Sequence, residues 1–146
     1  MKHRSLEILH RLREYDLEQE EGKLVQRQRE EKAKEQDCYR SLDVLQGSYH
    51  HSVDNAQVHD YSRRDGCVRE AGLRHNYDLR QYGMAQIARN EQVQETLKAK
   101  TRADMIAKVL EKRREQDRVE ADLRDRREMD DVAQNQFIYS RNEPLF

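Results

Sequence analysis

The side chains best suited to chemistry in this chain are three histidines and a cysteine near its middle. His50, His51, His59 and Cys67 are residue types that bind zinc, and histidine also titrates near neutral pH. Their spacing matches no zinc motif, so we predict neither a metal site nor any other cofactor. A pH-sensing role for these histidines, together with His75, is the weaker alternative to solvated side chains at a turn.

Signatures of catalysis are not found in the sequence. It contains no glycine-rich phosphate loop, no Gly-x-Ser-x-Gly element and no nucleophile with an orienting base. We therefore predict a protein without enzymatic activity and without a small-molecule substrate. Cys38 and Cys67 are too few for a disulfide scaffold and are expected to be reduced thiols in a cytosolic protein.

The element that dominates the chain is a run from Met84 to Glu143 without glycine or proline, rich in Arg, Glu, Asp and Gln. Such a run predicts one long helix. Two series of residues, each repeating every seven positions, fit the core-lining positions of a coiled coil: Val109, Gln116, Leu123, Asp130 and Phe137, and Met105, Lys112, Val119, Arg126 and Ala133. Several of these positions are polar, which makes a weak seam and predicts a surface for a partner.

Composition points to the same class of protein. Charged residues make up 39% of the chain and hydrophobic residues 35%, too little apolar surface for a wide core. Disorder is the alternative, but the single proline and the regular apolar spacing favour a folded chain. The net charge is −1 with the two signs interleaved, so we predict no nucleic-acid or lipid partner.

Residues that favour turns gather between two helical patterns, at Gly47, Asp54, Asn55, Ser62 and Gly66. We therefore predict an all-α fold, a long two-helix antiparallel coiled-coil hairpin whose second helix is longer than the first. The chain would form a single domain over residues 1–146, with a first helix over about 5–52, capped by Ser5, a turn over about 53–62, a second helix over about 63–140 and a flexible tail over 141–146.

A turn near Val58 sets the pairing of the two helices. Leu42 and Leu45 would then lie near Ala71 and Leu73, and Tyr39 would lie near Tyr77. The first helix would end opposite about residue 111, leaving the rest of the second helix as a docking element without an internal partner. The segment 26–37 has almost no apolar residues, so we expect it to be solvated and to depend on charge pairs within its own helix.

Membrane segments are not predicted. The basic stretch Met1–Leu12 contains no continuous apolar run, and no part of the chain approaches the roughly 20 apolar residues of a membrane span. We expect neither a signal peptide nor an anchor.

Three stretches resemble the FliJ family of flagellar export stalks and the related stalk subunits of virulence type III secretion systems. They are Leu6–Leu9, Leu110–Arg114 and Arg127–Ala133. The last stretch reads Met129-Asp130-Asp131-Val132-Ala133, with Asp131 where the family usually has Glu.

The resemblance implies a cytoplasmic stalk, peripheral to the inner membrane, like the central γ subunit of rotary ATPases. Both chain ends would lie in the pore of a hexameric export ATPase, promoting ring assembly and activity, and the hairpin tip would face the export gate, a membrane protein. Export chaperones are further partners that the family implies.

Two sets of contact residues follow from the resemblance. The ATPase ring would contact Leu6, Leu9, Arg13, Arg113, Arg114, Val119, Leu123, Arg126 and Arg127. The export gate would contact Tyr39, Leu42, Leu45, Tyr49, Leu73, Tyr77 and Tyr82. The alternatives are that the arginines are solvated and that Leu42, Leu45 and Leu73 only hold the hairpin together.

Two other functions compete with the export stalk. One is a generic coiled-coil adaptor or chaperone for another assembly. The other is a helix pair that binds nucleic acid through Arg124, Arg126 and Arg127, which would weaken steeply with salt.

Overall fold

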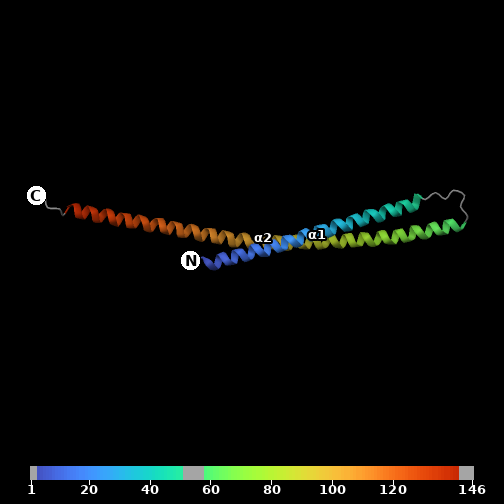
Figure 1. Ribbon diagram of the computed structural model, residues 1–146, viewed down its shortest axis with the longest axis horizontal. Coiled ribbons are helices and arrows are strands. Elements are labelled where there is room, and N and C mark those ends of the chain that lie inside the picture. Colours follow the sequence, from blue (N-terminus) through green and yellow to red (C-terminus); the bar gives the residue numbers. More distant parts are fainter. Residues whose placement is uncertain (1–2, 51–57, 142–146) are drawn as a thin grey trace. The chain divides into compact units, whose positions relative to one another are not determined.

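The chain folds into two long α-helices that pack against each other in antiparallel directions (Figure 1). A computed structural model describes residues 3–50 and 58–141. Helix α1 spans Arg4–His50 and helix α2 spans Val58–Arg141. The predicted all-α antiparallel hairpin with a longer second helix is therefore confirmed.

The helix ends differ in detail from those predicted. Helix α1 begins before Ser5, and the Glu7 N–H donates to the His3 carbonyl at 2.9 Å, so Ser5 lies inside the first turn and does not cap it. Residues 58–62 were expected in the turn but are helical. One Gly such as Gly66 costs a helix only about 1 kcal/mol, which a long helix absorbs. The rest of the predicted turn, and residues 142–146 of the predicted tail, lie outside the described residues.

The chain divides into two compact units. The central unit is Glu14–Thr101, and the terminal unit combines Met1–Arg13 with Arg102–Phe146. Each helix therefore contributes residues to both units.

Small and polar residues make up most of the α2 face that packs on α1 in the central unit. Ala71, Asp78 and Ala99 are buried and are separated by multiples of seven residues, and Ser41 is buried on α1. The Ser41 Oγ donates to the Cys38 carbonyl at 3.0 Å. Small side chains allow two helices to approach closely, so these positions bring the two backbones together.

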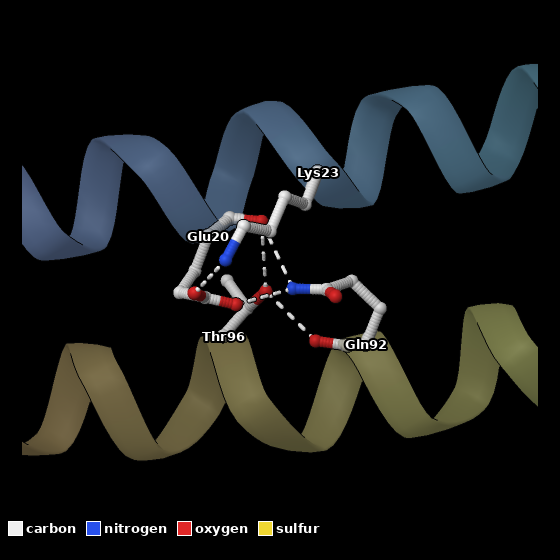
Figure 2. Close-up of polar contacts among 4 residues, drawn as sticks. All are labelled: Glu20, Lys23, Gln92 and Thr96. Carbon is white, nitrogen blue, oxygen red and sulfur yellow. Dashed lines mark hydrogen bonds and ion pairs between the residues drawn. The ribbon is translucent and has the colours of Figure 1, made fainter.

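Polar contacts cross between the helices at several levels of the central unit. Figure 2 shows one such cluster, in which the Glu20 carboxylate accepts from Gln92 Nε2 at 2.6 Å and from Lys23 Nζ at 2.7 Å. The Glu20 carbonyl also accepts from Thr96 Oγ1 at 3.3 Å. These contacts fix the position of the α1 backbone against α2.

A second cross-helix contact joins Glu31 to Arg89. The Arg89 guanidinium donates from Nε at 2.9 Å and from Nη2 at 3.3 Å to the two carboxylate oxygens. We expected segment 26–37 to depend on pairs within its own helix, as Arg27 and Glu30 do at 2.9 Å. For Glu31 that expectation was wrong, because this residue lies one heptad from Leu24 and from Cys38, on the face of α1 turned to α2.

The pairing of the two helices agrees with the predicted register. Ser41 Oγ lies 3.0 Å from His75 Nδ1, and a Cβ built on Gly72 would lie 4.0 Å from Leu45 Cδ1. Leu45 therefore faces the region of Ala71, as predicted. Leu73, by contrast, is 66% exposed and does not hold the hairpin together.

Candidate docking surface

The first turns of α1 are joined to α2 by two polar contacts in the terminal unit. Arg114 Nη2 donates to Glu7 Oε1 at 2.9 Å, and His3 Nε2 lies within hydrogen-bonding distance of Asp117 Oδ2. The hydrogen bond from Arg114 lowers the pKa of Glu7 below its ordinary value of 4.5. Helix α1 therefore accompanies α2 as far as Asp117, somewhat beyond the predicted limit near residue 111.

Beyond that point α2 is exposed on all sides. Every side chain from Arg118 to Tyr139, which we call the docking segment, is exposed. Its large apolar residues are between 47% and 75% exposed; they are Val119, Leu123, Met129, Val132, Phe137, Ile138 and Tyr139. So much exposed apolar surface on one helix is typical of an interaction site.

The predicted core-lining residues of α2, which begin at Met105 and Val109, lie on a different face of the helix from the one that packs on α1. In the terminal unit the packed face contains Ala103 and Leu110, each 6% exposed, at seven-residue spacing. Met105 and Val109 are 61% and 45% exposed. Because Val109 is one residue from Leu110, it points about 100° away around the helix. The predicted core-lining positions therefore form an exposed face of α2 from Met105 onward.

Charges of both signs flank the apolar residues of the docking segment. The segment contains four arginines and six carboxylates, with no block of one sign. A partner that covers this face would need interleaved charges of its own.

All nine residues predicted to contact an ATPase ring lie in the terminal unit. Leu6, Leu9 and Arg13 are half-buried, whereas the α2 members Arg113, Arg114, Val119, Leu123, Arg126 and Arg127 are exposed. Among them, Arg114 is already bonded to Glu7. The contact with a ring itself stays a prediction.

The seven residues predicted to contact an export gate all lie in the central unit. Tyr39, Tyr49, Leu73 and Tyr77 are exposed, and Leu42, Leu45 and Tyr82 are half-buried.

Tyr82 belongs to the packing of the two helices. Its hydroxyl lies 3.4 Å from Glu35 Oε1, to which it donates. Burial, and then the nearby Glu35 charge, raise the pKa of Tyr82 above 10.0. The contact of this set with a gate stays a prediction.

The predicted set missed five large exposed apolar residues of the docking segment: Met129, Val132, Phe137, Ile138 and Tyr139. Phe137 belongs to one of the two heptad series, whereas the other four lie outside both series, so the repeat alone did not select them. The signal that could have found them is their position past the end of α1, where no face of α2 is covered.

Metal-ligand types are dispersed in the part of the chain that the structure describes. There, no three His, Cys, Asp or Glu residues lie close enough to hold a metal ion. His50 is exposed and His75 bonds to Ser41. His51 and the side chain of His59 lie outside the described residues, so the prediction of no metal site is not tested at these two histidines. Cys38 and Cys67 are both free thiols.

Neither helix, over its described residues, has a stretch long and apolar enough to cross a membrane.

Comparison of the chain with protein-family models, with curated proteins and with solved structures finds no match in any of the three. The class that the fold defines is a two-helix antiparallel hairpin, and no family is identified.

Proposed function

We propose that this protein is a non-enzymatic stalk of a type III protein export apparatus, flagellar or virulence-associated. Its docking segment binds inside a hexameric export ATPase, promotes assembly and activity of the ring, and couples the ring to the export gate. The observation that carries the proposal is the exposed apolar face of Arg118–Tyr139, which continues past the last contacts of α1.

The energetics of the docking segment support a role in binding. Burying apolar surface contributes about 25 cal/mol per Å², and several exposed apolar side chains such as Leu123 and Phe137 are available on one helix. The segment is already helical, so a partner need not order an extended chain. The interleaved charges limit affinity, which suits a contact that must change as a ring cycles.

The central unit supplies the second contact of the proposed stalk. Tyr39, Tyr49, Leu73 and Tyr77 are large exposed side chains on α1 and α2. We assign to them the contact with the cytoplasmic part of the export gate, at the inner membrane. Export chaperones are further partners that this surface would serve.

The proposal is tested by co-purifying the chain with a hexameric export ATPase and measuring hexamer yield and ATPase rate. A truncation after Asp117 retains the Glu7–Arg114 and His3–Asp117 contacts but removes the docking segment. We expect it to abolish stimulation. The double variant V119D/L123D should do the same within the full chain.

The matched control is Leu73→Asp, which places the same charge on an exposed leucine of the central unit. It should leave ring stimulation unchanged. If the truncated chain stimulates the ATPase as well as the full chain does, the docking assignment is wrong.

The competing functions predict different results. An adaptor for another assembly would still use the docking segment but would not change the ATPase rate. A nucleic-acid partner is disfavoured by the charge of the segment, because Arg124, Arg126 and Arg127 alternate with a larger number of carboxylates. Filter binding at low salt that retains no DNA or RNA would eliminate that function.

A further inference from the structure

The heptad residues of the docking segment form a symmetric pattern about Glu128. Val119 and Phe137 lie nine residues to either side of Glu128, Leu123 and Ala133 lie five residues to either side, and Arg126 and Asp130 lie two residues to either side. All six side chains are exposed. An apolar residue thus mirrors an apolar residue, and an arginine mirrors an aspartate.

A pattern with this symmetry is suited to antiparallel pairing of two identical helices. In an antiparallel pair of identical helices, each core-lining position of one helix faces the mirror position of the other, and the two classes of heptad position face each other. Pairing about Glu128 therefore sets Val119 against Phe137 and Leu123 against Ala133 of the second copy. It also sets Arg126 against Asp130 twice, once on each side of the two-fold axis.

We propose that a second copy of this chain occupies the docking segment and forms an antiparallel two-helix dimer centred on Glu128. This inference goes beyond the proposed function and does not depend on it, because it requires only the exposed segment and its own charge pattern. The dimer covers the face assigned to the ring, so self-association and ring binding compete.

Two other arrangements of two copies, a parallel pair in register and an antiparallel pair shifted by one heptad, are less well matched. A parallel pair in register sets Arg126 against Arg126 and Asp130 against Asp130. An antiparallel pair shifted by one heptad sets Leu123 against Arg126 and Val119 against Asp130. Like charges in contact, or a charge facing an apolar residue, are unfavourable at a coiled-coil core. Charge complementarity therefore favours the pairing about Glu128 over these two arrangements.

The positions beside the core add one favourable and one unfavourable contact. Met129, 74% exposed in the single chain, meets Met129 of the second copy beside the axis. On the other side Arg127 meets Arg127, and Asp131, one turn along, offsets that repulsion. The paired region from Val119 to Phe137 is about 28 Å long at 1.5 Å per residue. So small an interface gives a reversible dimer with a dissociation constant on the order of 10–100 μM.

The test is sedimentation equilibrium of the full chain, without any other protein, from about 1 to about 500 μM, the range that spans the expected dissociation constant. The wild type should shift from its 17.6 kDa monomer to twice that mass. Four variants separate the possibilities: R126D, D130R, the exchanged pair R126D/D130R, and R124D as the matched control.

Each single reversal creates two like-charge contacts in the dimer and should raise the dissociation constant at least about tenfold. The exchanged pair restores both opposite-charge contacts and should return to within about threefold of the wild type. Arg124 lies one residue from Leu123, outside the core-lining positions, so R124D should change the dissociation constant less than about twofold. Circular dichroism should show unchanged helix content in all four variants.

Three results would overturn the proposal. A wild type that stays monomeric up to about 500 μM leaves the face for a different partner. A dimer that is insensitive to both single reversals is parallel or forms elsewhere, and one that the exchanged pair does not restore uses a different register. Since no ATPase is present, the result is independent of whether the chain binds an export ring.

Discussion

The contact between Glu31 and Arg89 is the clearest ion pair between the helices of the central unit. The Glu31 side chain is 17% exposed and that of Arg89 is 35% exposed, between a solvated pair and a buried one. Both guanidinium contacts run from α2 to α1, so the pair fixes the register as well as adding stability.

A double-mutant cycle with Glu31→Gln and Arg89→Met should measure a coupling energy of about 1 kcal/mol for this pair, because its burial is intermediate. Urea denaturation of the four proteins gives that value. The control cycle uses Arg27 and Glu30, an exposed pair within α1, which should couple by only about 0.3 kcal/mol. Equal coupling energies in the two cycles would show that the Glu31–Arg89 pair stabilises the protein no more than an exposed pair within one helix.

Acid sensitivity should arise from two carboxylates with lowered pKa values. The hydrogen bond from Arg114 lowers the pKa of Glu7, and hydrogen bonds from Lys23 and then Gln92 lower that of Glu20. Each ionised carboxylate stabilises the fold above its unfolded pKa, and this stabilisation is lost as the pH falls through the lower folded pKa. The free energy of unfolding should therefore fall as the pH drops below about 4.5.

Urea denaturation at a series of pH values from about 6 to about 3, a range that covers the ordinary carboxyl pKa, would measure that fall. The Glu20→Gln variant has one carboxylate fewer and should lose less stability over the same range. A stability that rises in acid, or the same slope for the variant and the wild type, would contradict this account.

At the scale of the helices, Leu110 is the large apolar residue most deeply placed between α1 and α2 in the terminal unit, with 6% exposure. Its replacement by alanine should destabilise the protein by about 2–3 kcal/mol, through lost burial and a residual cavity. Leu123→Ala, on a side chain 48% exposed, should change stability by less than about 0.5 kcal/mol.

Urea denaturation at low micromolar concentration, below the dissociation constant expected for the proposed dimer, would compare the two leucines. If Leu123→Ala costs as much as Leu110→Ala, then the docking segment is packed in solution and the exposed face described above is wrong.

The two helices and their register could be predicted from the sequence because helix breakers are rare outside one short region and apolar residues are regularly spaced. The face of α2 that packs on α1 could not. Large apolar residues usually mark such a face, but here Leu73 and Met105 point outward while Ala71 and Asp78 lie inside. Cross-helix pairs such as Glu31 with Arg89 depend on the register to within one residue, which a seven-residue pattern does not fix.

At the scale of the whole molecule, the chain contains two units with different surfaces. The central unit has polar contacts between its two helices and exposes tyrosines, while the terminal unit ends in a helix that no other described segment covers. One exposed face accounts for both proposed contacts of the terminal unit, the export ATPase and a second copy. The proposed export gate would use the other unit.

The most direct test of the ring contact is site-specific photo-cross-linking of the full chain mixed with a hexameric export ATPase. A photoactivatable residue at Leu123 probes the docking segment, and one at Tyr77, which is 55% exposed in the central unit, serves as the matched position. We predict a cross-link from position 123 to the ATPase and none from position 77. Cross-linking from position 77 alone, or from neither position, would contradict the proposal that the docking segment binds the ring.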